Sequence, residues 1–353
     1  MTAREPIKVL VVDDSLVCRE MLAQILESDP DIHVVGMARD GSEAVELTRQ
    51  LEPDIISMDI HMPKMDGIEA TEEIMAYVPT PILVVSSSVR PDQTGPAFDA
   101  LAAGALDVLK KPEPKDWSEL ERIGHELIAK VKLLAHVHVV THLKGRLRDR
   151  ERRRIERGPV FAGHGRNVLA IGSSTGGPSA LMAVLSRLPA DFGYGVVVAQ
   201  HIADGFIPGL VDWLATQCKL PIREARDGED IEAGTVLIAP TGGHMKVSLG
   251  RVFQVEATAK DLYRPSCDVL FDSVAQAYDK RAVGVILTGM GSDGSRGLKR
   301  LHDAGAYTIA QDEATSVVYG MPRAAVEAGA VDVVAPLDEI SEEIVKAFAA
   351  PLP

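Results

Sequence analysis

Residues 8–12 read Lys-Val-Leu-Val-Val and lead directly into Asp13 and Asp14, while residues 55–58 read Ile-Ile-Ser-Met and lead directly into Asp59. Three further apolar runs follow the same pattern: His33–Met37, Ile82–Val85 and Asp107–Leu109. Helical stretches separate the runs. Nearly continuous apolar strands that alternate with helices are typical of a parallel sheet covered on both faces. The first part of the chain is therefore predicted to be an α/β domain with an open parallel sheet.

A second alternating unit begins near Asn167. Its expected strands are Val168–Ser173, Val196–Gln200, Val236–Ala239, Val283–Leu287, Tyr307–Ala310 and Val331–Val334. Met245–Val255 is expected to form a hairpin, with Leu249, Gly250 and Arg251 in its turn. The predicted fold class is therefore α/β, with two doubly wound parallel-sheet domains.

The composition is that of a soluble globular protein. Of 353 residues, 46% are hydrophobic and 25% charged, and the formal net charge is −14. This acidic balance argues against binding nucleic acid, and no apolar run approaches the ~20 residues that membrane insertion requires. Met1–Pro6 shows no signal-peptide pattern. Cys18, Cys218 and Cys267 are far apart and lack a C-x-x-C pair, so we expect reduced thiols in a cytoplasmic protein, without a disulfide framework or a zinc motif.

A basic segment separates the two units. Residues 141–157 carry eight Lys or Arg residues against three Asp or Glu residues, and Gly158, Gly163 and Gly165 follow. We interpret residues 126–166 as an interdomain linker. Its charge is either solvated or forms a contact surface for an acidic partner.

Polar side chains follow four strands of the first unit: Asp13, Asp14, Asp59, Ser86 and Lys111. They are expected to meet, because the carboxyl ends of parallel strands open on one crevice. Three carboxylates this close repel one another, and a hard divalent cation with oxygen ligands, Mg²⁺ for preference, relieves that repulsion. The lysine and the hydroxyl are suited to hold a phosphoryl group on one carboxylate.

The second unit opens with a glycine-rich turn between a strand and a helix. Gly172, Ser174 and Gly176 fit G-x-S-x-G, a sharp turn that presents a serine near a helix N-terminus. Backbone N–H groups there are able to stabilise an oxyanion. A turn that binds a phosphate has the same signature, and the motif alone leaves both interpretations open.

Two further residues complete a candidate triad. His201 follows the strand Val196–Gln200, and Asp293 follows the strand Val283–Leu287. The strand-end rule brings both to the crevice of Ser174, as a general base and its orienting carboxylate. His302 is an alternative base by chain order, but we expect it within one helix after Asp293, out of reach of the strand ends.

Four stretches of the first unit resemble the response-regulator receiver domain: Val12–Ser15, Met58–Gly67, Val85–Ser87 and Lys110–Pro112. The resemblance implies a flavodoxin-like fold in which Asp59 accepts a phosphoryl group from a chemotaxis histidine kinase. It also implies the other roles: Asp13 or Asp14, Asp59 and the His61 carbonyl as Mg²⁺ ligands, Ser86 as the switch hydroxyl, and Lys111, before Pro112, as the phosphate-binding lysine.

Five stretches of the second unit resemble the chemotaxis protein-glutamate methylesterase: Gly172–Gly177, Ala199–Ile202, Arg264–Ala275, Leu287–Gly294 and Gln311–Pro322. The resemblance implies a Rossmann-like domain with Ser174 as nucleophile, His201 as base and Asp293 as third member. Thr175 then helps to position the histidine, and the backbone N–H of Met290 contributes to the oxyanion hole.

Together the two resemblances imply a receiver domain over residues 1–125, the linker over 126–166 and a serine methylesterase domain over 167–350. The implied activity is phosphorylation-activated hydrolysis of glutamate γ-methyl esters, with deamidation of specific glutamines, on methyl-accepting chemotaxis receptors. Through it the protein would control sensory adaptation. Mg²⁺ serves phosphorylation, and the esterase needs no cofactor. The receiver is expected to cover the esterase crevice until Asp59 is phosphorylated.

Two other functions were weighed against this one. Gly172, Ser174 and Gly177 loosely imitate a dinucleotide fingerprint, which would make the second unit a nucleotide-binding adaptor. His201, however, occupies the place where a ribose-binding acidic residue is expected. A transcriptional regulator is disfavoured because the chain has an acidic net charge and its second unit shows neither a helix-turn-helix pattern nor a basic recognition helix.

Overall fold

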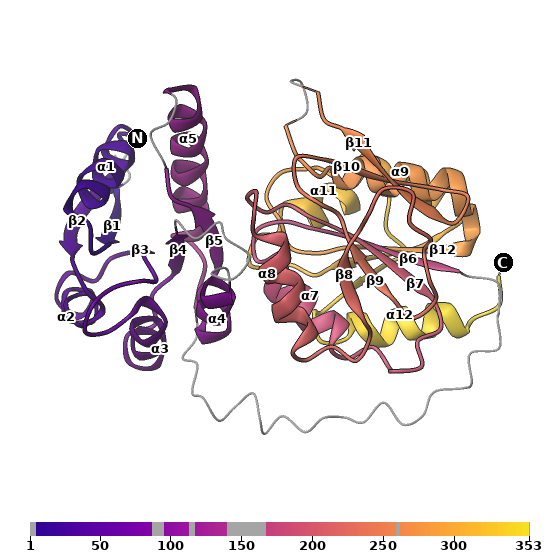
Figure 1. Cartoon of the computed structure of the whole chain (residues 1–353), viewed down its shortest axis with the longest axis horizontal. Helices are drawn as coiled ribbons and strands as arrows, with labels where there is room; N and C mark the ends of the chain where they lie inside the picture. The colour runs from indigo at the N-terminus through magenta and orange to yellow at the C-terminus, as the bar shows by residue number, and fades with distance from the viewer. Residues whose placement is uncertain (1–4, 87–94, 113–116, 140–166, 259–261, 353) are drawn as a thin grey trace. The chain divides into compact units, whose positions relative to one another are not determined.

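The computed structural model describes residues 5–86, 95–112, 117–139, 167–258 and 262–352 (Figure 1). The chain divides into two compact units, Met1–Arg152 and Arg153–Pro353. Residues 140–166, which include the basic segment, lie outside the described residues. Among the helices that the structure describes, none is both long enough and apolar enough to cross a membrane.

The first unit is a five-stranded parallel sheet in the order β2-β1-β3-β4-β5. Its elements are β1 (Ile7–Val12), α1 (Leu16–Glu27), β2 (Ile32–Ala38), α2 (Gly41–Leu51), β3 (Ile55–Met58), α3 (Gly67–Tyr77), β4 (Ile82–Ser86), α4 (Gly95–Ala103), β5 (Asp107–Lys110) and α5 (Trp117–Leu134). Helix α1 packs against α5, and α3 packs against α2 and α4, so the two groups cover opposite faces of the sheet (Figure 1). This arrangement confirms the predicted fold.

Helix α5 runs past the expected domain boundary at residue 125. Its buried side chains Ile123, Leu127, Val131 and Leu134 recur at helical spacing, so one apolar face continues along the whole helix. The first nine residues assigned to the linker therefore belong to a packed helix of the first unit. The periodicity of these four residues was the sequence signal for it.

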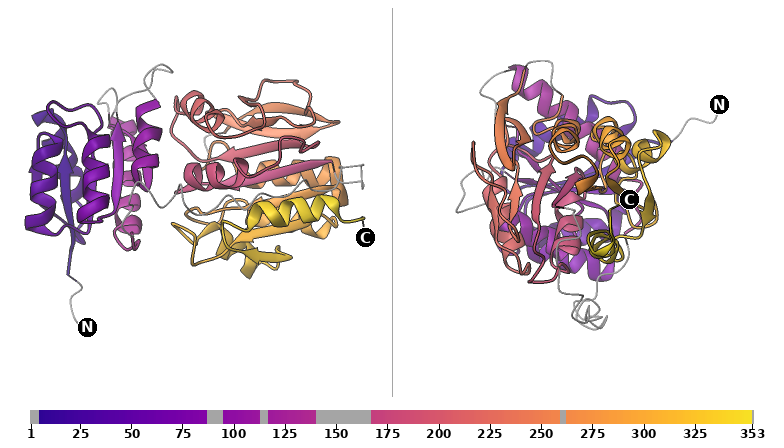
Figure 2. Two further views of the ribbon diagram at one scale, coloured as in Figure 1. Left: turned by 90° about the horizontal axis from the view of Figure 1, so that it is seen from below. Right: turned by 90° about the vertical axis from the view of Figure 1, so that its right-hand side faces the viewer.

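The second unit is a seven-stranded parallel sheet in the order β14-β13-β12-β6-β7-β9-β8, with an antiparallel hairpin beside it. Its elements are β6 (Val168–Ser173), α7 (Gly177–Leu185), β7 (Gly195–Gln200), α8 (Ile207–Ala215), β8 (Ile222–Glu224), β9 (Val236–Ile238), β10 (Gly243–Ser248), β11 (Arg251–Glu256), α9 (Cys267–Tyr278), the 3₁₀ turn η1 (Asp279–Arg281), β12 (Ala282–Ile286), α10 (Ser295–Asp303), β13 (Tyr307–Gln311), α11 (Met321–Glu327), β14 (Val333–Ala335) and α12 (Ile340–Ala349). Helices stand on both faces of this sheet (Figure 2).

Most of the expected strands are present, and the differences lie at the sheet edges. Strand β8 was not predicted, since it is a three-residue, half-buried edge strand without an apolar run. Strand β14 begins at Val333 rather than Val331. The hairpin is confirmed, and its turn consists of Leu249 and Gly250, both with positive φ, while Arg251 already belongs to β11.

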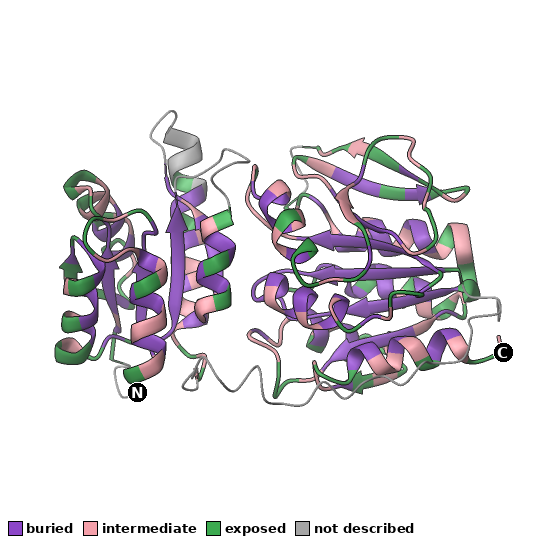
Figure 3. Cartoon of the chain, turned by 60° about the horizontal axis from the view of Figure 1, so that its bottom comes forward, coloured by how far each residue is buried: buried purple, intermediate pink, exposed green. Residues whose placement is uncertain are grey.

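The central strands are buried on both faces, which explains their nearly continuous apolar sequences (Figure 3). In each sheet the chain starts at a central strand and adds strands on one side of it. It then crosses back and adds the remaining strands on the other side. The strand order reverses between β1 and β3 in the first unit and between β6 and β12 in the second. Crevices at such reversals, beyond the carboxyl ends of the strands, are where ligands bind in open α/β sheets.

One buried ion pair ties α5 to its sheet and yields a stability prediction. The Lys130 ammonium contacts the Asp107 carboxylate, and the two side chains are only 14% and 7% exposed. Replacing Lys130 by Met leaves Asp107 buried without its cation, so we expect a loss of about 3 kcal/mol in the free energy of unfolding. Native-state hydrogen exchange of the backbone amides in β5 and α5 measures it.

Lys132→Met is the matched control, because Lys132 pairs with Asp29 and Asp31 at the surface of the same helix. A much smaller loss is expected there. Equal losses for the two variants would contradict a special contribution from the buried pair.

Candidate functional site

In the first unit, three carboxylates and a lysine meet at the reversal point between β1 and β3. Oxygens of Asp13, Asp14 and Asp59 all lie within 4.8 Å of one another. Lys111 Nζ lies 2.6 Å from Asp13 Oδ2 and 2.8 Å from Asp59 Oδ2. Asp13, Asp59 and Lys111 are buried, whereas Asp14 is exposed. The residues that were predicted to meet at the ends of these strands therefore do lie together.

This cluster holds more negative than positive charge. Burial, together with the charge of Asp13, raises the pKa of Asp59 despite the opposing contact with Lys111. Burial lowers the pKa of Lys111, but its bonds to Asp13 and Asp59 outweigh this and raise that pKa overall. One ammonium therefore faces three carboxylates, and this donor set of oxygens fits a hard divalent cation such as Mg²⁺.

The remaining residues predicted for this site flank the cluster. Ser86 is buried at the end of β4, and His61 is exposed two residues beyond Asp59. Helix α3 begins very close to the cluster, since a Cβ atom on Gly67 would lie 2.0 Å from the Asp59 carbonyl oxygen. A glycine at this position is what allows the helix to approach the backbone of Asp59.

In the second unit, the turn between β6 and α7 presents Ser174. Gly176 adopts a φ of +74°, which favours glycine, and helix α7 starts at the next residue. The Ser174 N–H donates to the Thr288 carbonyl at 3.0 Å, which joins this turn to the loop after β12. A Cβ atom at position 289 would lie 2.7 Å from Ser174 Cβ, so Gly289 lets that loop pass directly over the serine.

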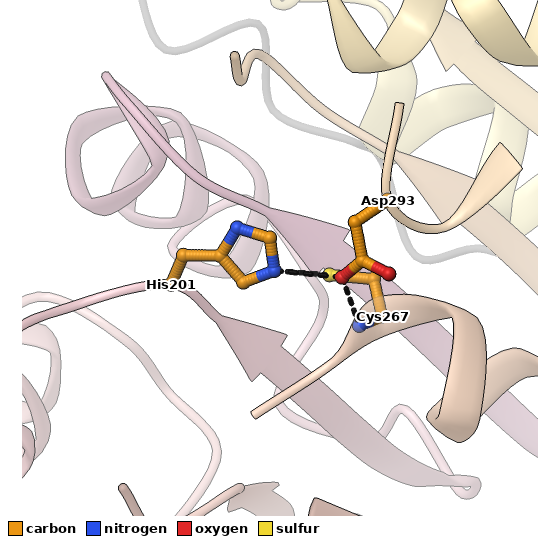
Figure 4. Close-up of side chains that lie close together, drawn as sticks. All are labelled: His201, Cys267 and Asp293. Atoms are coloured by element: carbon orange, nitrogen blue, oxygen red, sulfur yellow. Dashed lines mark hydrogen bonds and ion pairs between the residues drawn. The ribbon is translucent and has the colours of Figure 1, made fainter. Parts of the chain in front are cut away.

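The side chains of His201 and Asp293 are hydrogen-bonded to each other beside this turn. His201 follows β7 and Asp293 lies in the loop before α10, and His201 Nε2 is 2.8 Å from Asp293 Oδ2 (Figure 4). His201 Nδ1 is buried and has no hydrogen-bond partner among the described residues. The nitrogen opposite the carboxylate is therefore the one left for a proton transfer. No hydrogen bond joins the described side chains of Ser174 and His201.

The Asp293 carboxylate is held by the N-terminus of α9. It accepts hydrogen bonds from Ser266 Oγ at 2.8 Å, the Cys267 N–H at 2.6 Å and the Asp268 N–H at 3.2 Å. Burial by itself raises the pKa of Asp293, but the bonds from His201, Ser266 and Cys267 outweigh it and keep that pKa below its usual value. Asp293 is thus a buried anion with fixed orientation.

Gln200 connects the serine turn to the histidine. Its Nε2 donates to the carbonyls of Ser174 at 2.8 Å and His201 at 2.7 Å, and its Oε1 accepts from Ser173 Oγ at 2.5 Å. The side chain is fully buried, so these bonds are not shared with water. Sequence reasoning missed this role, although the position directly before a candidate base was a signal.

Tyr263 is a second residue that sequence reasoning missed. Its ring stacks on the His201 ring with centroids 4.6 Å apart and an interplanar angle of 9°. It is partly exposed, so it covers one face of the imidazole at the opening of the site. Nothing in its own sequence neighbourhood indicated a contact with a histidine 62 residues away.

The other predicted residues lie as follows. Met290 is 40% exposed, and its backbone N–H has no hydrogen-bond partner among the described residues, as an oxyanion donor requires. Thr175 is buried in the serine turn, but no hydrogen bond joins it to His201 within the described residues. His302 lies in α10 near Asp303 and Asp332, away from Asp293, so His201 is the histidine paired with that carboxylate.

Comparison with known proteins shows the family of the chain. The family model for the CheB methylesterase matches residues 169–344, and that for the response regulator receiver domain matches residues 9–120. A protein-glutamate methylesterase/protein-glutamine glutaminase from Anaeromyxobacter dehalogenans is 48% identical over 335 residues, covering 95% of each chain. The chain belongs to the CheB methylesterase family. A similarly named protein of Syntrophus aciditrophicus is 43% identical over 351 residues, covering 96% of this chain and 98% of that one.

A solved structure extends the family match to the fold. The crystal structure of the Thermotoga maritima CheB methylesterase catalytic domain matches with a TM-score of 0.50 and 36% identity, over 51% of this chain and 98% of that one. The chain is therefore a two-domain α/β enzyme of the methylesterase family with a receiver domain.

The close fit between Gly177 and Gln200 yields a prediction for this family member. A Cβ atom on Gly177 would lie 2.0 Å from Gln200 Oε1, and Gln200 cannot give way without breaking its hydrogen bonds. We expect Gly177→Ala to lower the free energy of unfolding by about 1–3 kcal/mol, measured by denaturation. Gly193→Ala is the control, since its Cβ would meet nothing nearer than 3.9 Å. Equal effects would rule out the steric explanation.

Proposed function

We propose that this enzyme hydrolyses glutamate γ-methyl esters and deamidates specific glutamines on methyl-accepting chemotaxis receptors, under control of phosphorylation at Asp59. The activity is that named for its relatives, the protein-glutamate methylesterases/protein-glutamine glutaminases. The observation that carries the proposal is the His201–Asp293 pair, 2.8 Å apart, at the reversal point where Ser174 is presented. In the cell it would act on the cytoplasmic part of the receptors and so adjust sensory adaptation.

The proposed reaction uses a Ser-His-Asp triad. Ser174 Oγ attacks the γ-carbonyl carbon, and His201 accepts the serine proton at Nδ1 while Asp293 stabilises the imidazolium through Nε2. His201 returns the proton to the leaving group, methanol from an ester or ammonia from an amide. A water molecule, deprotonated by His201, then hydrolyses the acyl-enzyme. The unpartnered Nδ1 and the anchored carboxylate support these roles.

Two further residues are proposed to assist the triad. The Met290 N–H is proposed to donate a hydrogen bond to the oxyanion, because Met290 lies in the loop that Gly289 brings over Ser174. Thr175 is proposed to hold the imidazole in its reactive position once substrate is bound. Its burial beside Ser174 supports this, although its contact with His201 would have to form then.

In the first unit, Asp59 is the proposed phosphoryl acceptor and a chemotaxis histidine kinase the donor. Asp13, Asp14, Asp59 and the His61 carbonyl would hold Mg²⁺, which when bound neutralises the phosphoryl oxygens. Lys111, already 2.8 Å from Asp59, would contact the phosphoryl group as a fixed charge, and Ser86 would donate a hydrogen bond to it. The proposed domain limits are a receiver domain over residues 1–134, which takes in all of α5, a linker up to residue 166 and a methylesterase domain over residues 167–350.

The triad assignment predicts a selective loss. Ser174→Ala should lower methanol release from methylated receptor by at least about a thousandfold, because the covalent step has no nucleophile. Phosphorylation of Asp59 should be unchanged. Ser173→Ala, which removes only a hydrogen bond to Gln200, should keep turnover within about tenfold of the parent. Undiminished methanol release by Ser174→Ala would refute the assignment.

The regulatory proposal predicts a release of activity on truncation. Removing residues 1–160 should raise methanol release above that of the unphosphorylated full chain, by roughly 5–150-fold if the coupling is of ordinary size. Full-length Asp59→Asn is the matched control and should keep the low activity with or without a phosphodonor. A truncated enzyme no more active than the unphosphorylated parent would contradict inhibition by the receiver domain.

A further inference from the structure

A cysteine lies against the catalytic pair. Cys267 Sγ is 3.6 Å from His201 Nε2, and ligand atoms of His201, Cys267 and Asp293 all lie within 4.8 Å of one another (Figure 4). The three residues come from the end of β7, the start of α9 and the loop before α10. The reaction proposed above uses the histidine and the carboxylate and has no role for the thiol.

These three side chains form a set of ligands suited to a thiophilic divalent cation. In a tetrahedral zinc site with a Zn–S bond of ~2.3 Å and a Zn–N bond of ~2.0 Å, the sulfur and nitrogen lie ~3.5 Å apart. The corresponding distance here is 3.6 Å, and the nitrogen–oxygen distance of 2.8 Å needs only a small increase. The fourth position of the cation would be left for water or substrate, as at an open site.

We propose that His201 Nε2, Cys267 Sγ and an Asp293 oxygen bind Zn²⁺ or a similar thiophilic cation, and that this binding inhibits the hydrolase. The inhibition rests on the function proposed above, whereas the binding does not. His201 keeps 11% of its side chain exposed, which gives a cation an approach to the pair from solvent.

Binding of the cation changes the protonation of Cys267 and His201. In the free enzyme the buried thiol is protonated, because burial and the charge of Asp293 raise the pKa of Cys267 well above its usual value. On binding, the thiol proton leaves to solvent and Sγ bonds the cation. Nε2 also gives up its proton, and Nδ1, which has no hydrogen-bond partner in the described part of the chain, takes one up. The thiolate and Asp293 then balance the two positive charges.

A histidine in that state cannot act as a base. Its Nδ1 already carries a proton, so it is unable to accept one from Ser174, and Asp293 is no longer free to stabilise an imidazolium. The receiver cluster differs in kind, because Asp13, Asp14 and Asp59 offer only oxygen ligands, which favour Mg²⁺. One chain therefore holds a hard-cation site in its first unit and a thiophilic site in its second.

Binding is tested with Co²⁺ as a spectroscopic probe of the metal-free full chain. A thiolate-to-cobalt charge-transfer band should appear and should disappear when Zn²⁺ is added. The band should persist in Cys18→Ala/Cys218→Ala, which leaves Cys267 as the only cysteine, and vanish in Cys267→Ala and Cys267→Ser. Oxygen ligands of the receiver give no such band. Its absence in the double variant, or its survival in either Cys267 variant, would overturn the proposal.

Inhibition is tested separately on methanol release. Zn²⁺ should inhibit the parent and the double variant, a chelator should restore the activity, and each Cys267 variant should need at least about tenfold more Zn²⁺ for the same fractional inhibition. A cobalt band without inhibition would refute the inhibitory role of the site. If Ser174→Ala shows the band while the parent releases no methanol, metal binding stands and the proposed hydrolase function fails.

Discussion

The buried carboxylate of Asp293 is the interaction on which the catalytic unit depends. It accepts hydrogen bonds from Ser266 Oγ and two N–H groups at the start of α9, and it pairs with His201 Nε2 at 2.8 Å. A carboxylate removed from water in this way is stable only while these donors surround it. The same bonds therefore fix α9 against the loop before α10 and set the orientation of the imidazole. The Asp293 carboxylate therefore both stabilises the packing of α9 and orients His201.

Both units of the chain exploit one property of parallel sheets. In each, the strand order reverses beside a central strand, β1 in the first unit and β6 in the second, and the polar residues stand where those strands end. The apolar side chains of these strands are buried on both faces of each sheet. Gly67 then lets α3 approach the backbone of Asp59, and Gly289 lets the loop after β12 approach Ser174.

The two sites differ in how they treat buried charge. In the first unit Lys111 faces Asp13, Asp59 and the exposed Asp14, an excess of negative charge that suits a divalent metal ion. In the second unit the donors around Asp293 leave it a stable anion beside a histidine and a buried thiol. The first cluster thus carries unbalanced negative charge, while the second holds one carboxylate in a fixed orientation beside a histidine.

The sequence by itself determined the fold class, the succession of strands and helices along the chain, and the polar residues at the strand ends. These features could be predicted because apolar periodicity and the position after a strand are local properties of the sequence. It also carried a signal for the length of α5, the spacing of Ile123, Leu127, Val131 and Leu134, which the expected boundary at residue 125 overlooked. Only the tertiary structure decided that Gln200 bridges the serine turn and the histidine, that Tyr263 stacks on His201, and that Cys267 stands 3.6 Å from Nε2. These contacts join residues from different elements, and their distances follow from how α9 and the loops pack on the sheet. No spacing along the chain encodes that packing.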